Sequence, residues 1–259
     1  MTRELLTRRN ALRGLAGAGG LMLAGCDKLS QNQTFQKMLE TAEHLNLGGQ
    51  RLALTANAPL AREYQRSDIS RVFKANGTVR PSGDAYGRLA STGFSDWRLK
   101  IEGLVEKPME LSLDEIKRLP TRTQITRHDC VEGWSAIGEW TGTPLGPLLQ
   151  SAGLKPNARY IVFRCADDLL GSLDGSGLYY ESIDLIDAFH PQTILAYKMN
   201  GEDLPVRHGA PLRVRIERQL GYKMAKYIMR IEIVESFQKI GFGRGGFWED
   251  RGYEWYAGI

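Results

Sequence analysis

Residues 127–134 read RHDCVEGW and are the most informative stretch of the chain. Cys130 comes just after a strand candidate, residues 125–128, and starts a loop that contains Gly133 and Trp134. A metal or a nearby cation can remove the proton of a cysteine in such a place, so Cys130 is a candidate metal thiolate. One thiolate cannot hold a metal tightly, so the remaining ligands would come from an organic cofactor. A lone cysteine is more often a small buried core residue, and other motifs must decide between the two.

Two later segments carry cations next to glycines: residues 208–213 read HGAPLR and residues 221–226 read GYKMAK. Arginine can bind a phosphate through two hydrogen bonds, lysine acts as a point charge, and glycine lets the backbone approach an anion. The pattern suits a phosphorylated cofactor, although its spacing is neither that of a Walker A loop nor that of the dinucleotide-binding G-x-G-x-x-G. The alternative is that Lys223 and Lys226 lie on a solvated edge.

Short strands and short helices follow one another along the chain. Apolar runs predict strands at residues 97–101, 125–128, 160–164, 193–197, 212–216 and 227–234. Helices are predicted at residues 113–119, with Ser112 as the N-cap, and at residues 144–152. Residues 65–95 are rich in Gly, Ser, Arg and Asn and are expected to form an extended loop. This mixture predicts a single α+β domain with a mixed β-sheet.

Four motifs in a fixed order, RHDCVEGW, YIVF, HGAPLR and GYKMAK, carry a family resemblance. From about residue 71 to residue 234 the chain resembles the sulfite oxidase family of molybdopterin-dependent oxidoreductases. Its bacterial periplasmic members, which include the catalytic subunit of a methionine sulfoxide reductase, show the stronger likeness. The resemblance implies a sulfite oxidase-like molybdopterin-binding fold over residues 65–259. It also implies a molybdenum–molybdopterin cofactor.

The resemblance implies roles for particular residues. Cys130 matches the cysteine that ligates molybdenum, and Tyr179 matches a tyrosine near the metal, so these two are the candidate catalytic residues. The candidate cofactor-binding residues are Phe73, Asn76, Cys130, Cys165, Asp167, His208, Arg213, Met224, Ala225 and Lys226. For Cys165, its apolar surroundings favour a packed core thiol over a cofactor contact.

Two departures from the sulfite oxidase pattern bear on the substrate. Ala75 and Ser135 stand where sulfite oxidases carry arginines that bind the sulfite dianion. We therefore predict two-electron, oxygen-atom-transfer chemistry at a Cys-ligated molybdenum, with a small sulfoxide-like substrate reduced. The alternatives are a sulfite dehydrogenase of the same family and a non-catalytic binding lipoprotein with the same fold. The aromatic segment at residues 241–256 either pins a loop to the domain or lines the substrate funnel.

Residues 1–26 are predicted to be an export signal. Residues 7–12 read TRRNAL, which resembles the twin-arginine motif, and a weakly apolar run follows. Cys26 ends the segment LAGC, which resembles a lipoprotein cleavage box, so we expect a lipid anchor to the inner membrane there. The alternative is an ordinary signal with a chance cysteine. Both alternatives predict that the enzyme is in the periplasm. Residues 27–64 are predicted to be a helical segment before the main domain.

Composition and motifs also bear on the partners. Much of the formal charge of +4 lies in the predicted signal, and the near-neutral remainder gives no electrostatic case for binding nucleic acid. The sequence has no haem-attachment motif and no iron–sulfur cysteine pattern, so turnover of a small-molecule substrate requires a separate electron-transfer partner. The family resemblance implies that this partner is a haem membrane protein.

Overall fold

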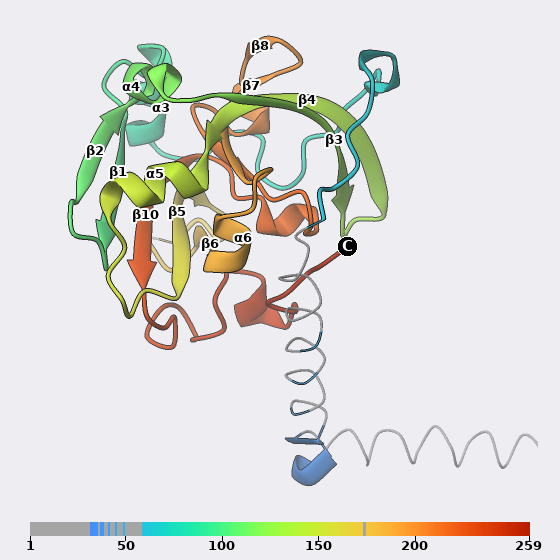
Figure 1. Ribbon diagram of the computed structural model, residues 1–259, viewed down its shortest axis with the longest axis vertical. Coiled ribbons are helices and arrows are strands. Elements are labelled where there is room, and N and C mark those ends of the chain that lie inside the picture. The colour runs from blue at the N-terminus through green and yellow to red at the C-terminus, as the bar shows by residue number, and fades with distance from the viewer. Residues whose placement is uncertain are drawn as a thin grey trace, which may run out of the picture. The chain divides into compact units, whose positions relative to one another are not determined.

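The computed structural model describes residues 32–35, 37, 38, 41, 45, 49, 59–172 and 175–259 (Figure 1). The chain divides into two compact units, Met1–Asn57 and Ala58–Ile259. In the first unit the described residues 33–35, 37, 38, 41, 45 and 49 are helical. The predicted signal, residues 1–26, lies outside the described residues, and so does its Cys26.

The first of two sheets in the described part of the second unit is a mixed sheet of five strands. Its strand order is β2 (Met109–Ser112), β1 (Arg98–Gly103), β10 (Ile228–Val234), β5 (Tyr160–Asp168) and β6 (Leu178–Asp184). β1 and β10 run parallel, with Lys100 beside Arg230, and the other neighbours run antiparallel. A strand from late in the chain therefore lies in the middle of this sheet, between an early strand and β5.

The second sheet carries the long hairpin that holds Cys130. It is formed by β3 (Arg122–Cys130), β4 (Trp134–Pro144), β7 (Ile194–Met199), β8 (Glu202–Asp203) and β9 (Arg213–Arg215). Figure 1 shows β3 and β4 arching across the unit, with the strands of the first sheet beneath them. The helices are short: α3 (Asp84–Ser91), α4 (Leu113–Arg118), α5 (Leu145–Ala152) and α6 (Leu185–Ala188). This arrangement confirms the predicted α+β class and mixed sheet.

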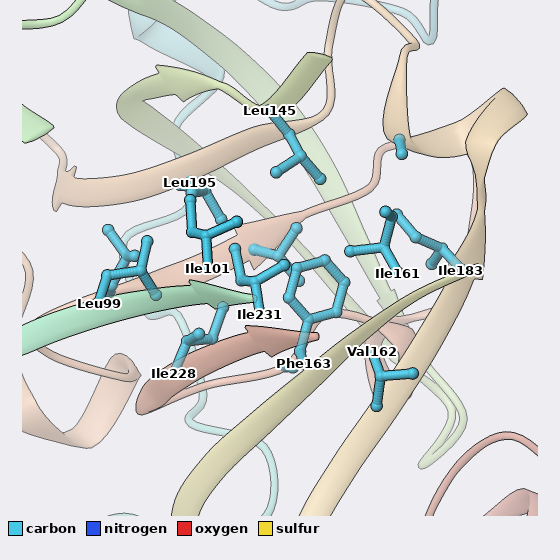
Figure 2. Close-up of a cluster of buried hydrophobic side chains, with 14 of the residues drawn as sticks. Leu99, Ile101, Leu145, Ile161, Val162, Phe163, Ile183, Leu195, Ile228 and Ile231 are labelled. Atoms are coloured by element: carbon cyan, nitrogen blue, oxygen red, sulfur yellow. The ribbon is translucent and has the colours of Figure 1, made fainter. Parts of the chain in front are cut away.

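The main hydrophobic core joins the two sheets (Figure 2). Leu99 and Ile101 point to the same side of β1 because alternate side chains of a strand face one way, and both are fully buried. They cluster with Phe163 of β5, Ile231 of β10 and Leu195 of the second sheet. This shared core fixes the hairpin of the second sheet relative to β5 and β10.

The predicted start of the helix after Ser112 is confirmed at α4. The Ser112 Oγ accepts a hydrogen bond from the backbone N–H of Glu115 at 3.2 Å, and the Glu115 carboxylate accepts one from the Ser112 N–H at 2.8 Å. Two backbone N–H groups that a helix leaves unpaired are thus satisfied reciprocally. The turn buries Ile116 against the core.

One expectation about local structure is wrong, and a second holds with a difference. Residues 65–95 are not extended throughout, because α3 forms at Asp84–Ser91 and buries Tyr86, whose hydroxyl donates to the Ala210 carbonyl at 2.5 Å. The strand predicted at residues 212–216 forms as β9 (Arg213–Arg215), but its charged side chains do not face solvent, because Arg213 and Arg215 are fully buried along with the apolar residues between and around them.

Candidate active site

The β3–β4 hairpin places Cys130 at its tip. Cys130 is the last residue of β3 and pairs with Trp134, the first residue of β4. The turn between them closes through a hydrogen bond from the Gly133 N–H to the Cys130 carbonyl at 3.0 Å, and Gly133 takes a positive φ of 82° that suits glycine. Val131 and Glu132 therefore stand out from the tip beside the thiol.

The environment of the Cys130 thiol acts on its pKa in two directions. Partial burial raises this pKa, and the negative charge of Glu132 adds to the rise. The backbone N–H groups of Glu132 and Val131, together with the charge of Lys74, lower it. The net effect is a raised pKa, because burial outweighs these donors. The protein alone therefore favours the thiol, and a bound metal would be needed to hold Cys130 as the thiolate.

Cys130 opens into a pocket with about 730 Å³ of empty space, part of which is open to solvent. The residues that line it are Asn76, Gly77, Thr78, Cys130, Val131, Glu132, Asp167, Leu169, Tyr179, Gly221, Tyr222, Met224, Lys226, Trp248 and Tyr253. Six of the residues singled out from the sequence lie among them: Asn76, Cys130, Asp167, Tyr179, Met224 and Lys226. These six come from five separate stretches of the chain, which the fold brings to one cavity.

The other candidates lie behind the pocket wall. Phe73 packs its ring against His128, Trp134, Trp140 and His208, with centroids 5.5 to 6.2 Å apart. The remaining four are buried and do not line the cavity: Cys165, His208, Arg213 and Ala225. Cys165 belongs to the main hydrophobic core, and its pKa is raised well above the usual value by burial.

Lys226 ties the loop that carries Asn76 to the segment after Gly221. Its Nζ donates to the Asn76 carbonyl at 2.6 Å and also to the Thr78 carbonyl. Burial lowers the pKa of Lys226 to about 7, and repulsion from Arg213 contributes to the fall. The carbonyl partners carry no net charge, and the negative charge of Asp167 offsets the charge of Lys226 only in part.

Arg213 and His208 extend this cationic region. The Arg213 Nη1 donates to the His208 carbonyl at 3.0 Å, and the guanidinium lies 4.8 Å from the centre of the Trp140 ring. Burial and then the neighbouring Arg215 lower the pKa of Arg213 to about 9. Burial and then Arg213 lower the pKa of His208 to about 4. His208 is therefore neutral near pH 7, and Arg213 and Lys226 are the buried cations of this region, with too few anions beside them.

The buried polar atoms that have no hydrogen-bond partner among the described residues include the Arg213 Nε and the Asp167 Oδ1. Such groups are costly to leave unpaired, so an orphaned donor and acceptor indicate the place of a ligand. A molybdopterin fits this donor set. Its phosphate would pair with Arg213, His208 and Lys226, its N–H groups would donate to Asp167, and the Cys130 thiolate would ligate the metal.

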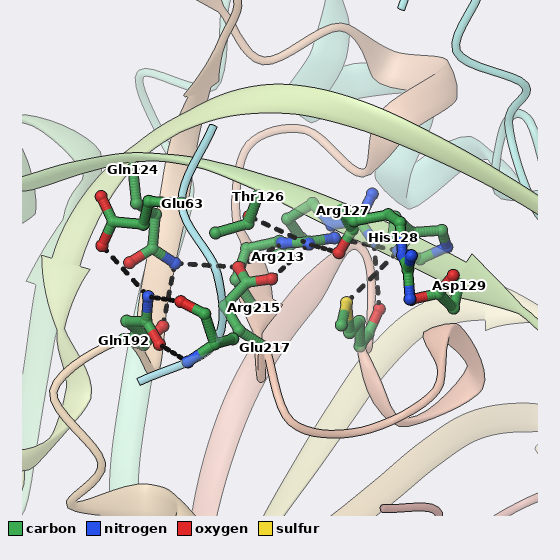
Figure 3. Close-up of polar contacts among 12 residues, drawn as sticks. Glu63, Gln124, Thr126, Arg127, His128, Asp129, Gln192, Arg213, Arg215 and Glu217 are labelled. Carbon is green, nitrogen blue, oxygen red and sulfur yellow. Dashed lines mark hydrogen bonds and ion pairs between the residues drawn. The ribbon is translucent and has the colours of Figure 1, made fainter. Parts of the chain in front are cut away.

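Behind β3 a buried polar network holds the inner face of the hairpin (Figure 3). The Arg215 guanidinium pairs with the Glu217 carboxylate at 2.6 Å and lies 2.9 Å from the His128 Nδ1. Burial and then Arg215 lower the pKa of His128 well below its usual value, so this histidine is neutral. The His128 Nδ1 therefore accepts from Arg215, and its ring packs under Gly221, where a Cβ would come within 2.4 Å of the Nε2.

Sequence reasoning missed Arg215 and Glu217 as parts of this network. The signal was present as a charged residue at alternate positions 213, 215 and 217, directly after HGAPLR. Such a pattern on a strand usually marks a solvated face. Here the segment is enclosed, and Trp140 packs against both Arg213 and Arg215, whose guanidinium carbons lie 4.8 and 4.5 Å from the ring centre.

Glu132 is a further pocket residue that sequence reasoning did not single out. Its Oε2 accepts from the Lys74 Nζ at 2.8 Å and from the Trp134 Nε1 at 3.0 Å. These two hydrogen bonds, led by Lys74, lower the pKa of Glu132. A carboxylate two residues from Cys130 was visible in the motif, but the pairing with Lys74 across the cavity edge was not.

Tyr179 lines the pocket, but its hydroxyl is engaged. It donates to the backbone carbonyl of Tyr222 at 2.5 Å, and burial raises its pKa well above the usual value. The tyrosine therefore fixes the turn Gly221–Lys223 that faces Cys130. A catalytic role for Tyr179 stays a prediction, and it would require the hydroxyl to give up or share this hydrogen bond.

Lys223 differs from the expectation for it, because it lies neither on a solvated edge nor on an open anion site. Its Nζ lies 2.5 Å from a carboxylate oxygen of Glu181 and 2.5 Å from one of Glu249, and all three side chains are buried. The charge of the two carboxylates raises the pKa of Lys223 against the effect of burial. This triad, which we call the Lys223 triad, joins the segment at 221–226 to the segment at 241–259.

The residues 241–259, here called the tail segment, satisfy both alternatives raised for them. Phe247 is buried, and its backbone N–H donates to the Tyr180 carbonyl at 3.0 Å, so the segment is pinned to β6. Trp248 and Tyr253 line the pocket that contains Cys130. The tail segment is therefore both an anchored loop and one wall of the cavity.

Comparison with known proteins places the chain in a family. Residues 87–240 match the family described as the oxidoreductase molybdopterin-binding domain. The chain belongs to this family. Similar family members include a protein of Azospira oryzae named "Putative protein-methionine-sulfoxide reductase subunit YedZ1", which is 37% identical over 256 residues, 98% of this chain and 89% of that protein.

Two Xanthomonas proteins named protein-methionine-sulfoxide reductase catalytic subunit MsrP are also similar. The one from Xanthomonas campestris pv. campestris is 38% identical over 152 residues, which cover 55% of this chain and 46% of that protein. The chain thus spans about half the length of the MsrP proteins. Among solved structures, the sulfane dehydrogenase SoxCD from Paracoccus pantotrophus matches at 25% identity with a TM-score of 0.48, over 55% of this chain and 39% of that chain.

Membership of the molybdopterin-binding oxidoreductase family confirms several predictions. The chain is an enzyme of the sulfite oxidase family, and its cofactor is molybdenum–molybdopterin. This result sets aside the non-catalytic lipoprotein as an alternative. The roles of individual residues stay predictions, which the geometry of the pocket supports.

Proposed function

We propose that the protein reduces methionine sulfoxide, with the sulfoxide bound in the pocket beside Cys130. The observation that carries the proposal is the charge of the pocket wall. Among the described lining residues Lys226 is the one cation, and the phosphate of the cofactor would pair with it, which leaves no free cation in the lining for a dianionic substrate. A dianion such as sulfite needs free cations at its site, whereas a neutral sulfoxide does not.

The cations nearest to Cys130 support the same choice. Lys74 pairs with Glu132 at 2.8 Å, and Arg127 pairs with Asp129 at 2.9 Å. Ser135, which stands at a sulfite-binding position of the family, donates to the Asp129 carboxylate at 2.5 Å. Both surface cations beside the hairpin tip are thus neutralised by neighbouring carboxylates.

Reduction of a sulfoxide consumes two electrons and two protons and yields a thioether and water. The molybdenum–molybdopterin cofactor supplies the two-electron chemistry when bound. The chain itself must orient the substrate and hold protons near it. Asp167 lines the pocket, and burial raises its pKa to about 6, so the oxygen of its carboxyl that does not accept from the pterin could exchange a proton near neutral pH.

The test measures metal content and turnover in both directions. Protein from a host that makes molybdopterin should contain about one molybdenum per chain, and Cys130→Ser should lose it. Reduction of a methionine sulfoxide peptide is then assayed with a reduced artificial electron donor, and oxidation of sulfite with an artificial acceptor. Sulfoxide turnover without sulfite turnover supports the proposal. Robust sulfite oxidation with no sulfoxide reduction would contradict it and favour a sulfite dehydrogenase.

We further propose a separate electron-transfer partner. The similar proteins are named as subunits, which supports an enzyme that works with another chain. We propose a haem membrane protein for this role, as the family resemblance implies. A haem-containing membrane fraction should reoxidise or reduce the enzyme at a rate that falls when its haem is removed. An unchanged rate would contradict this choice.

We propose export by the twin-arginine route to the periplasm, with residues 1–26 as the signal and residues 65–259 as the catalytic domain. The helical segment predicted for residues 27–64 is wrong at its end, because residues 59–64 are not helical and Glu63 forms a β-bridge with Thr126. No helix in the described residues is long and apolar enough to cross a membrane. A lipid at Cys26 would supply the attachment to the inner membrane. Radiolabelled fatty acid should enter the wild type and not Cys26→Ser, and replacement of Arg8 and Arg9 by lysine should stop export.

A further inference from the structure

Three aromatic rings form a continuous apolar wall on one side of the pocket. Trp248 and Tyr253 of the tail segment stack with ring centres 5.4 Å apart and planes 26° from parallel. Tyr253 also meets Tyr222 edge to face at 5.1 Å. All three line the same cavity as Cys130. We call these residues the aromatic wall.

The aromatic wall is held in place by buried polar contacts. Glu249, next to Trp248, is buried and pairs with Lys223 at 2.5 Å. The Tyr222 hydroxyl donates to the Glu254 carbonyl at 2.6 Å, one residue after Tyr253. The rings are therefore positioned before any substrate arrives, which reduces the entropy lost on binding.

The polar residues of the pocket form a second group with its own contacts. Lys226 holds the carbonyls of Asn76 and Thr78, and its charge acts on Asp167. A dialkyl sulfoxide has a matching division, with a polar oxygen on one side of sulfur and two alkyl arms on the other. Carbon–hydrogen groups beside an electron-poor sulfur pack well on the electron-rich faces of aromatic rings.

We propose that Trp248 and Tyr253 bind the alkyl arms of the sulfoxide and set the specificity of the site for methionine sulfoxide side chains. This inference rests on the proposed function. The entrance supports it: Tyr253 and Val131 both line the pocket and are 40% and 41% exposed, so a side chain that enters meets apolar surface first. With the alkyl arms against the wall, the sulfoxide oxygen is left to face Cys130, and the polar group stays with the cofactor.

The test compares variants within the tail segment. Trp248→Ala and Tyr253→Ala should each raise KM for a methionine sulfoxide peptide about tenfold and change kcat less than about twofold, because the wall binds the substrate and does not take part in the chemistry. Trp248→Phe keeps a ring and should stay within about threefold of the wild-type KM. Phe242→Ala is the matched control, because Phe242 is in the same segment, is 78% exposed and does not line the pocket.

A binding measurement separates this inference from the proposed function. A peptide that carries methionine sulfone has the same alkyl arms and is not expected to turn over, so its affinity is measured by calorimetry on the molybdenum-loaded enzyme. The affinity should fall about tenfold in Trp248→Ala and Tyr253→Ala and recover in Trp248→Phe. Equal sulfone affinity and equal KM in wild type and both alanine variants would overturn the inference. Absence of sulfoxide turnover in the wild type, with sulfone binding still dependent on the wall, would overturn the proposed function alone.

Discussion

Two buried lysines three residues apart behave in opposite ways. Lys223 is surrounded by the carboxylates of Glu181 and Glu249, and its pKa is raised. Lys226 has carbonyl partners, and burial and then Arg213 lower its pKa to about 7 against the weaker effect of Asp167. The first cluster contains its own counter-ions and ties the tail segment to the turn at Gly221–Lys223. The second is unbalanced, which is the property of a site that awaits an anion.

Removal of Lys223 should have the largest effect on folding. Lys223→Met leaves two carboxyl groups buried without a cation, which should lower the free energy of unfolding by about 3–5 kcal/mol. Burial already holds the pKa of Glu181 well above its usual range, so its folded form binds more protons than its unfolded form. The stability of the variant should therefore fall as pH rises from 5 to 8. Urea denaturation at both pH values measures this.

The matched surface control for that experiment is Lys239→Met, because Lys239 is exposed. It should change the unfolding free energy by less than about 0.5 kcal/mol. If Lys223→Met were equally mild, the Lys223 triad would not anchor the tail segment.

Removal of Lys226 should affect the cofactor rather than the fold. Lys226→Met deletes a cation that is already destabilised by burial, so the apo protein should remain within about 1 kcal/mol of wild type. Loss of one charge-assisted bond should weaken retention of the phosphorylated cofactor about 10- to 100-fold. Pterin and molybdenum content after dialysis measure this retention. If Lys226→Met kept its full pterin content but unfolded easily, Lys226 would stabilise the fold rather than bind the cofactor, which contradicts the role given to it here.

The sequence could predict that Lys223 and Lys226 matter, but not how they differ. Both stand in GYKMAK beside a glycine, and local pattern treats them alike. The difference comes from Glu181 and Glu249, which lie 42 and 26 residues away in the chain. A counter-ion that comes from a distant part of the chain cannot be recognised from the residues next to the lysine.

The strands and helices show the same difference: elements with a local sequence signal could be predicted, and elements that depend on distant contacts could not. Strong alternation predicted β10, and the capping pattern at Ser112 predicted α4, because both signals are local. The long strand β4 was missed, since Gly138 and Gly142 interrupt its pattern. At Gly142 a Cβ would lie 2.3 Å from the Leu195 carbonyl oxygen, so glycine is needed there for the close approach of β7.

The unbalanced cluster should respond to anions in a pH-dependent way. The burial cost of charged Lys226 is complete below its folded pKa of about 7 and disappears as the lysine loses its proton at higher pH. An anion offsets this cost only while the charge is present. Sulfate, whose charge is constant over this range, should raise the Tm of the apo protein at pH 6 and bind about tenfold more weakly at pH 8.5. The Lys226→Met variant should lose this pH dependence, and a pH-dependence that persists in it would assign the effect to another group.

An exposed ion pair at the pocket edge gives the smallest expected effect and completes the comparison. Lys74 and Glu132 are 62% and 43% exposed, so solvent screens their attraction, and Lys74→Ala should change the unfolding free energy by less than about 1 kcal/mol. The hydrogen bond from Lys74 is the first cause of the lowered pKa of Glu132, so its removal should raise this pKa and move the acid limb of the activity profile to higher pH. Lys74→Arg should keep the wild-type profile, and 1 M salt should shift the wild type in the direction of Lys74→Ala. A large loss of stability would mean that the exposed pair behaves like the buried Lys223 triad. An unchanged pH–activity profile would mean that Glu132 takes no part in the protonation steps at the pocket.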